Sequence, residues 1–117
     1  VRLCRLTSLL DLNQRSPFVR SKLSNYLNTL ISIGVAGFRL DAGKHMYPED
    51  IDAILTMTTN LRSDVFGDGK RPFVVSEVID HGGEAISCYE YLNVGRYTNF
   101  NFGDAVSAAV RRDDDLA

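Results

Sequence analysis

Residues 35–40 read Val-Ala-Gly-Phe-Arg-Leu, a short and almost wholly apolar run, and an acid, Asp41, follows it directly. A glycine precedes the run and a polar cluster follows it. This pattern suits a strand covered on both faces, as strands of parallel sheets are. Residues 73–79, Phe-Val-Val-Ser-Glu-Val-Ile, form a second run of the same kind. The two runs predict neighbouring strands of one parallel sheet.

Helical patterns alternate with these strands. The pair Ser-Pro at residues 16–17 is typical of a helix start, and apolar residues then recur at helical spacing over residues 19–31. Gly34 is expected to end this helix. A second helix is expected from Pro48, with an apolar stripe that runs as far as Leu61.

The rest of the chain continues the alternation. Residues 68–72 predict a turn, residues 96–102 a third strand, and Asp104 the start of a third helix. This order predicts an α/β fold in which right-handed crossovers join parallel strands. A barrel and an open doubly wound sheet fit it equally well. No glycine-rich dinucleotide fingerprint and no P-loop pattern occurs, which argues against a nucleotide-binding fold.

Length and composition narrow the function further. A chain of 117 residues is one small domain or a piece of a larger one. Its net charge of -2 gives no electrostatic case for binding nucleic acid or an anionic membrane surface, and no apolar run reaches membrane-spanning length. Both ends, Val1 and the charged tail, are expected to be cut. Cys4 and Cys88 are too few for a disulfide framework, and whether they pair is left open.

Acids lie at the predicted carboxyl ends of the first two strands, where parallel sheets and barrels gather their functional residues. Asp41 follows the first strand and Glu77 lies inside the second. Taken singly, each acid could form a structural ion pair with Arg39. Two acids with several cations on one rim make chemistry the better interpretation. The further charged residues expected on that rim are Lys44, His45 and Asp80.

The surroundings of the two acids predict different roles. Arg39 lies two residues before Asp41, so both side chains point to the same strand face, and the cation favours an ionised Asp41 that can act as nucleophile. Glu77 has apolar neighbours, and we expect it to keep its proton and act as the acid. This division fits glycoside hydrolysis with retention, which needs carboxyl groups about 5–5.5 Å apart.

Two motifs resemble those of a known enzyme family. Residues 37–45, Gly-Phe-Arg-Leu-Asp-Ala-Gly-Lys-His, resemble the strand-4 motif of alpha-amylases, and residues 77–80, Glu-Val-Ile-Asp, resemble their strand-5 motif. The likeness is closest to the animal type, which also shows the Gly-Gly-Glu of residues 82–84, and it extends over residues 1–103. It implies a partial sequence: part of a (β/α)8 TIM barrel, roughly strands 4 to 6 with the intervening helices. Residues 1–15 would then close domain B, and residues 16–117 would belong to the barrel.

The resemblance also implies an activity. Alpha-amylases hydrolyse internal alpha-1,4-glucosidic bonds of starch, glycogen and malto-oligosaccharides with retention, and an animal enzyme would be secreted and monomeric when full length. By resemblance, Asp41 is the nucleophile, Glu77 is the general acid/base, and Arg39 supports Asp41 and binds chloride. The residues that match sugar-binding positions or could line the sugar cleft are Lys44, His45, Asp80, Glu84, Leu6 and Leu9. For the two leucines, core packing is the simpler interpretation.

A calcium site is implied in the same way. Arg2 and His45 match ligands that use their backbone carbonyls, and Asp11 matches a carboxylate ligand. Hard oxygen ligands suit calcium. Taken alone, Asp11 is better interpreted as a helix- or turn-capping residue, and His45 could be an ordinary rim histidine.

The chain also departs from the family pattern. The third catalytic acid and the other chloride ligands would follow Ala117, and the remaining calcium ligand and the disulfide partner of Cys4 would precede Val1. Leu3 replaces a residue that is usually polar, and Cys88 has no expected counterpart. Less than half a barrel leaves open sheet edges, so we expect the isolated chain to be unstable and inactive.

Two other functions are alternatives to an alpha-amylase. A non-catalytic relative, such as the amylase-like subunit of an amino-acid transporter, typically loses catalytic carboxylates, whereas this chain keeps Asp41 and Glu77. A related alpha-glucosidase or transglycosidase generally lacks the Lys-His pair of residues 44–45 and the Glu-Val-Ile-Asp form. The sequence therefore favours an alpha-amylase.

Overall fold

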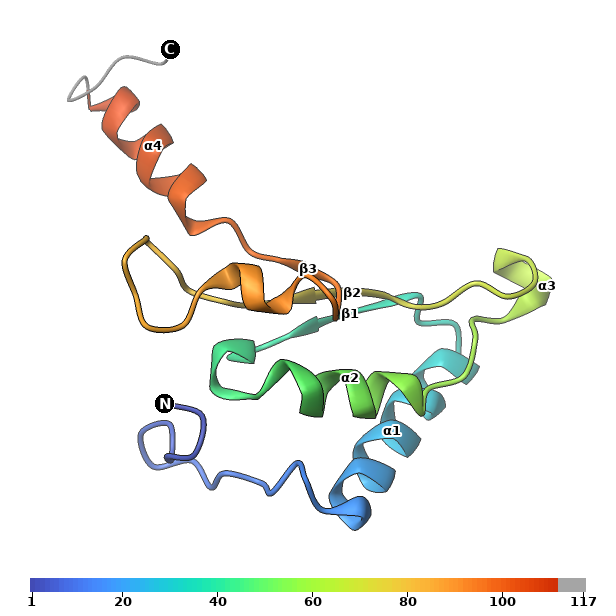
Figure 1. The fold of residues 1–117 in the computed structure, drawn as a ribbon. Helices are drawn as coiled ribbons and strands as arrows, with labels where there is room; N and C mark the ends of the chain where they lie inside the picture. Colours follow the sequence, from blue (N-terminus) through green and yellow to red (C-terminus); the bar gives the residue numbers. More distant parts are fainter. Residues whose placement is uncertain (112–117) are drawn as a thin grey trace.

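A computed structural model describes residues 1–111 of the chain. Three parallel strands, β1 (Gly37–Leu40), β2 (Phe73–Ser76) and β3 (Arg96–Tyr97), form one sheet in which each strand lies beside the next one along the chain (Figure 1). Leu40 lies opposite Ser76, and Val75 lies opposite Arg96. The predicted parallel sheet is therefore confirmed, in the sequential strand order that barrels have.

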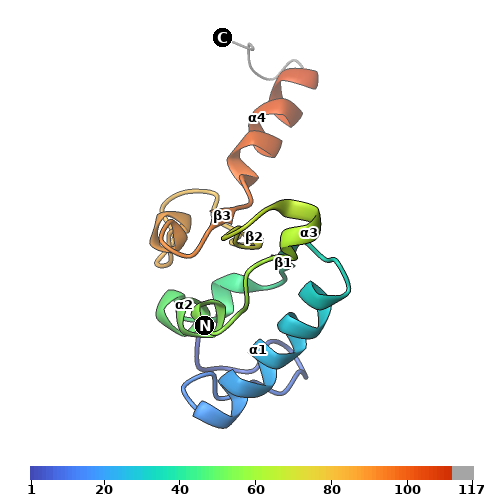
Figure 2. The same cartoon turned by 90° about the vertical axis from the view of Figure 1, so that its right-hand side faces the viewer.

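The helices α1 (Pro17–Ser32) and α2 (Pro48–Thr56) lie on one side of this sheet (Figures 1 and 2). They pack against each other below the strands in both figures. Arg20 on α1 donates a hydrogen bond of 2.7 Å to the buried carboxylate of Asp50 on α2. Among residues 1–111, no helix is both long and apolar enough to cross a membrane.

The opposite face of the sheet is open. Phe73 is 60% exposed and Arg39 also faces solvent, whereas Val74 and Ser76, on the other side, are buried. The expectation of strands covered on both faces is wrong for this part of the chain. The reason is that α1, α2 and the turns after the strands pack on a single face.

The second helix is shorter than predicted. It ends at Thr56, and Thr58 and Leu61 of the predicted stripe are buried outside any helix. Arg71 explains the end, because its guanidinium donates hydrogen bonds of 2.6 Å to the carbonyl of Leu55 and 2.5 Å to that of Thr58. The Leu55 carbonyl in the last helical turn and the Thr58 carbonyl just after it are thus satisfied by a side chain. A short helix that the sequence did not predict, α3 (Ser63–Phe66), follows.

Two further boundaries differ from the prediction. The second strand, β2, ends at Ser76, so Glu77 follows the strand instead of lying within it. The third strand has only two residues, and α4 (Phe100–Val110) begins four residues before Asp104. Asn99 sets this start, because its side-chain oxygen accepts the backbone N–H of Phe102 at 3.1 Å.

The core lies beneath the segments that leave β1 and β2. Its buried members are Ile51, Val78, Cys88, Tyr91 and Val94. The Tyr91 hydroxyl, on the 3-10 turn η2 (Cys88–Tyr91), donates to the carbonyl of Met46 at 2.8 Å and lies 3.2 Å from that of Lys44. The core therefore fixes the turn that follows β1, where the candidate site begins.

Replacing Gly95 by alanine is expected to lower the free energy of unfolding by about 1–3 kcal/mol. Gly95 has a φ of 150°, and a Cβ there would lie 2.6 Å from the carbonyl oxygen of Val74, so β3 could not approach β2 as closely. Urea denaturation of the complete gene product containing this chain would measure the loss. Gly103→Ala in α4 is the matched control: its Cβ would meet open space, so it should leave stability unchanged or raise it. Equal effects of the two substitutions would contradict this account.

Candidate active site

Asp41 and Glu77 directly follow the last residues of two neighbouring strands, β1 and β2, which end opposite each other. Leu40 and Ser76 are partners in the parallel register, and each acid is the next residue along its strand. The backbones are joined there too: the Glu77 N–H donates to the Leu40 carbonyl at 2.9 Å, and the Lys44 N–H donates to the Glu77 carbonyl at 3.2 Å. Both acids continue the alternation of the open face, which places them with Arg39 on that face.

Arg39 joins the two carboxylates. Its Nη1 lies 2.5 Å from Asp41 Oδ1, and its Nη2 lies 2.7 Å from Glu77 Oε1. The hydrogen bond to Asp41 and the charge of Glu77 raise the pKa of Arg39 above its ordinary value. The expected side-by-side placement of the three residues is thus observed. The same guanidinium contacts both acids, so Arg39 pairs with Glu77 as well as with Asp41.

Exposure distinguishes the two acids. The Asp41 side chain is 79% exposed, whereas that of Glu77 is 21% exposed. The second oxygen of Glu77 accepts the backbone N–H of Ala42 at 2.9 Å. Asp41 is therefore accessible to a ligand, and Glu77 is held by two donors in a half-covered position.

A turn with unusual backbone angles brings the N–H of Ala42 to the Glu77 carboxylate. Ala42 has φ 50° and ψ 33°, the left-handed region that residues with a side chain seldom adopt. The 3-10 turn η1 (Gly43–His45) follows, and a Cβ at Gly43 would lie 3.1 Å from the Cβ of Ser76. A glycine at this position lets the turn pack directly on the end of β2. The Ala-Gly pair after Asp41 was the only sequence signal for this geometry.

Lys44 and Glu84, two of the expected sugar-binding residues, form an ion pair. Lys44 Nζ also donates to the carbonyl of Ile79 at 2.5 Å, and Glu84 also accepts the backbone N–H of His81 at 3.2 Å. The ion pair with Lys44, and then the His81 N–H, lower the pKa of Glu84. The structure thus brings η1 and the loop after β2 together through charged side chains.

Asp80 is buried, with 8% of its surface exposed. Its two oxygens accept the N–H groups of Gly82 and Cys88, each at 2.8 Å. These backbone donors, that of Cys88 first, lower the pKa of Asp80. Direct sugar binding by Asp80 stays a prediction, and its observed contacts give it a role that the sequence did not indicate: it closes the loop formed by residues 80–88.

The loop also carries a pair that the sequence analysis missed. His81 Nδ1 lies 2.6 Å from Asp104 Oδ2 on α4, and the His81 ring meets that of Phe100 edge-on, with centroids 5.8 Å apart. The carboxylate of Asp104 raises the pKa of His81. No local pattern could have predicted a pair whose members are 23 residues apart.

The remaining predicted residues are Leu6, Leu9 and Arg2 in the N-terminal segment and His45 in η1. Leu6 and Leu9 are exposed, so core packing does not hold them in the described chain. The Arg2 guanidinium contacts Glu90 at 2.7 Å and the Tyr91 hydroxyl at 3.1 Å, which fastens the segment to η2. The His45 side chain is half-buried, within η1.

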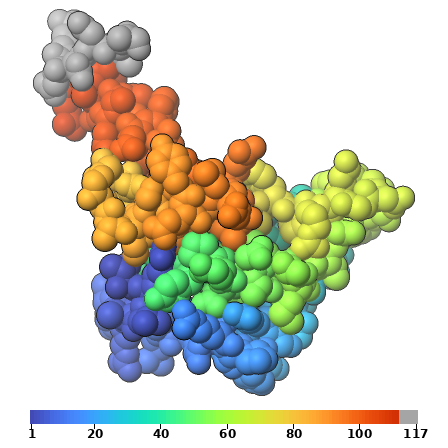
Figure 3. Space-filling model, viewed as in Figure 1, coloured from blue at the N-terminus to red at the C-terminus, as the bar shows by residue number. Residues whose placement is uncertain are grey.

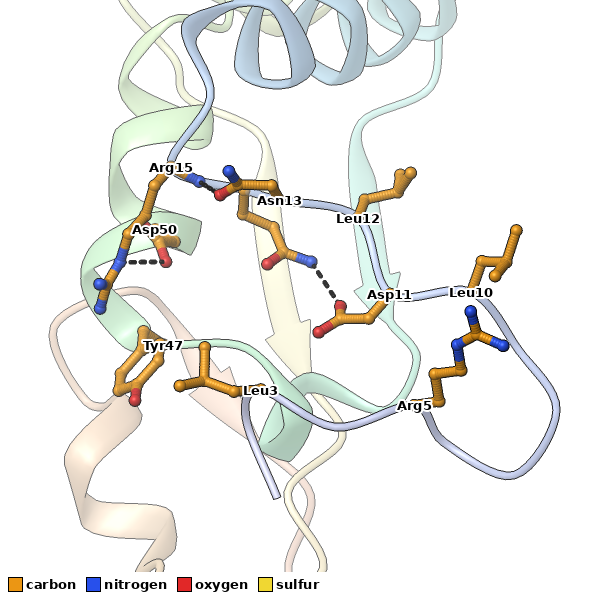
Figure 4. A pocket seen from close by; sticks show the side chains of 10 residues that line it. Leu3, Arg5, Leu10, Asp11, Leu12, Asn13, Arg15, Tyr47 and Asp50 are labelled. Carbon is orange, nitrogen blue, oxygen red and sulfur yellow. Dashed lines mark hydrogen bonds and ion pairs between the residues drawn. The ribbon is translucent and has the colours of Figure 1, made fainter.

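Asp11 lines a hollow of about 340 Å³ that the N-terminal segment forms with Tyr47 and Asp50 (Figure 4). Its carboxylate accepts a hydrogen bond from the Gln14 amide at 3.3 Å. Calcium takes six to eight oxygen ligands. Within residues 1–111, no three His, Cys, Asp or Glu side chains gather as a metal site would require. Asp11 is the one carboxylate of the predicted set, so these residues do not by themselves fit a complete calcium site.

Chloride binding by Arg39 stays a prediction, and the described residues do not show a complete chloride site. Both terminal nitrogens of the guanidinium already contact carboxylate oxygens. An anion there would also lie next to two acids and be repelled by them. We therefore derive no step of the chemistry from calcium or chloride.

Curated proteins similar to this chain include animal alpha-amylases. No family model matches the chain. Pancreatic alpha-amylase 2a5 of Mus musculus and pancreatic alpha-amylase of Homo sapiens are each 53% identical to it over 112 residues, which is 96% of this chain and 22% of the relative. The alpha-amylase of Pecten maximus is 48% identical over 97% of the chain. The chain thus spans about a fifth of the length of the curated relatives it matches.

Solved structures agree with these relatives. Wild-type alpha-amylase I of Eisenia fetida superposes with a TM-score of 0.94 at 43% identity, over 97% of this chain and 23% of that one. A mutant of the same enzyme in complex with maltohexaose gives the same TM-score at 42% identity. The similarity therefore covers both the sequence and the arrangement of its strands and helices.

Proposed function

Because this chain is homologous along nearly its whole length to animal alpha-amylases, we propose that it carries two of the catalytic carboxylates of such an enzyme. The reaction is internal hydrolysis of alpha-1,4-glucosidic bonds in starch and glycogen with retention. The observation that carries the proposal is the single guanidinium of Arg39 in contact with both Asp41 and Glu77. A retaining mechanism needs its two carboxyl groups about 5–5.5 Å apart, and the shared contact with one guanidinium supports a close placement of the two acids.

The geometry supports distinct tasks for the two acids. Asp41 is exposed and lies beside the Arg39 cation, a position that suits the nucleophile that attacks the anomeric carbon. In the second step Glu77, as a carboxylate, takes a proton from the attacking water. In the first step Glu77 must carry a proton.

The sugar-binding rim is the charged network beside the two acids. Lys44 and Glu84 offer donors and acceptors to sugar hydroxyls, and Asp80 holds the loop that carries Glu84. His45 lies on the same turn as Lys44. Malto-oligosaccharides are the proposed ligands, which the maltohexaose complex of the Eisenia fetida relative supports.

The family resemblance also supports proposals about the place of this chain in the whole protein, its localisation and its ions. Residues 16–117 would contribute strands 4 to 6 of a (β/α)8 barrel, and residues 1–15 would lead out of domain B. The pancreatic relatives support a secreted protein. Calcium and chloride would require ligands outside the described residues, and a monomeric state is likewise proposed from the family alone.

A product-anomer experiment tests the proposed function. The complete gene product containing this chain would be mixed with maltoheptaose and followed by proton NMR before mutarotation. We expect shortened oligosaccharides that first appear as the alpha anomer, because two displacements restore the configuration. First appearance of the beta anomer would contradict the mechanism. Release of single glucose units alone would favour an alpha-glucosidase, and absence of hydrolysis would favour a non-catalytic relative.

A further inference from the structure

In the described residues, the loop after β2 contacts α4 through the side chain of His81. Figures 1 and 2 show α4 projecting away from the sheet, and Figure 3 shows it as a separate lobe. Within residues 1–111, His81 makes the side-chain contacts described between this loop and α4: the ion pair with Asp104 and the edge-on contact with Phe100. The position of α4 and the position of the loop are therefore linked at His81.

The same residue is linked to the sugar-binding rim through its backbone. The His81 N–H donates to Glu84 Oε1, and Glu84 in turn pairs with Lys44 on η1. A displacement of His81 would therefore move a donor of Glu84. Asp80, the residue before it, fixes the base of the loop by accepting two loop N–H groups.

We propose that His81 and Asp104 act as a positioning pair that ties the loop of residues 80–88 to α4 and so holds Glu84 and Lys44 in place for sugar binding. This inference rests on the proposed function, because it takes the Lys44–Glu84 network as part of the sugar-binding rim. His81 itself need not touch the sugar. Its side chain is 49% exposed and its near nitrogen is engaged by Asp104.

The ion pair between His81 and Asp104 is expected to depend on pH. The groups that face His81 are Asp104 on α4, Glu84 in the loop and Lys44 on η1. The two carboxylates raise the pKa of His81, Asp104 most, and the ammonium opposes them. A histidine whose pKa is raised in the folded protein keeps its ion pair at lower pH and loses it as pH rises through that raised value. Sugar binding should therefore weaken on the alkaline side.

Maltohexaose binding to the complete gene product tests the inference. Calorimetry in an Asp41→Asn background, in which turnover is blocked, would give the Kd over a range of pH. We expect His81→Gln to raise the Kd at acidic pH by about two- to fivefold, the size typical of an exposed ion pair. The parent Kd should rise toward the same value at alkaline pH, while the variant stays flat. His81→Arg, which is charged throughout, should keep the Kd low across the range.

A double-mutant cycle and an NMR titration complete the test. Asp104→Asn should weaken binding as much as His81→Gln, and the two together should do no more than either alone. The His81 ring should titrate at lower pH in Asp104→Asn than in the parent. Additive effects, or identical titrations, would overturn the inference. Absence of hydrolysis by the unsubstituted parent would instead count against the proposed function, since the Kd and the titration do not depend on turnover.

Discussion

Replacing Asp41 by asparagine in the complete gene product is expected to slow starch hydrolysis by at least about 10⁴-fold. The reason is chemical: a neutral amide can neither attack the anomeric carbon nor balance the positive charge that develops on the sugar. Asparagine has nearly the same size, so the site keeps its shape. Initial rates on soluble starch, measured against the parent at equal protein concentration, would give the factor.

The fold should survive this substitution. The Asp41 side chain is mostly exposed, and the contact described for it is the one to Arg39. We expect the thermal unfolding midpoint and the affinity for maltohexaose to change little. Asp68→Asn is a matched control, because Asp68 is an exposed carboxylate in the turn before β2, at the other end of that strand from Glu77. It should leave the rate unchanged. A rate for Asp41→Asn within tenfold of the parent would refute the nucleophile assignment.

The positions of the two acids could be predicted from the sequence, because the physics that places them is local. An apolar run of strand length that ends in a charged residue puts that residue at the rim of a parallel sheet. Alternation along the strand then sets Arg39 and Asp41 on one face. The observed ion pair between them follows from these two rules. The same holds for α1, whose proline start and apolar spacing are local signals.

What could not be predicted depends on contacts between distant segments. The end of α2 is set by Arg71, which lies 16 residues after the carbonyl of Leu55 that it binds. The second contact of Arg39, to Glu77, exists because two strand ends meet in register. The buried place of Asp80 likewise depends on how its loop closes on Cys88. Propensity and periodicity carry no information on such pairs.

Replacing Glu77 by glutamine is expected to slow starch hydrolysis by about 10²- to 10⁴-fold, the usual contribution of a general acid or base. The loss should depend on the substrate. An alpha-maltotriosyl fluoride releases fluoride, which needs no protonation, so its first step should be nearly as fast in Glu77→Gln as in the parent. The glycosyl ester on Asp41 would then accumulate, because no base activates water. Azide needs no base, and it should restore turnover and give the alpha-glycosyl azide.

This substrate dependence separates a proton-transfer role from a structural one. Glutamine can still accept the Ala42 N–H, but its amide group cannot pair with Arg39 as the carboxylate does. If Glu77 only held Arg39 in place, starch and the fluoride would lose rate by the same factor, and azide would have no effect. Glu84→Gln is the comparison, because Glu84 pairs with Lys44 away from both acids. It should weaken substrate binding without any rescue by azide. Rescue by azide in Glu77→Gln but not in Glu84→Gln would show that Glu77 transfers the proton. Equal rate losses on starch and the fluoride would contradict a proton-transfer role for Glu77.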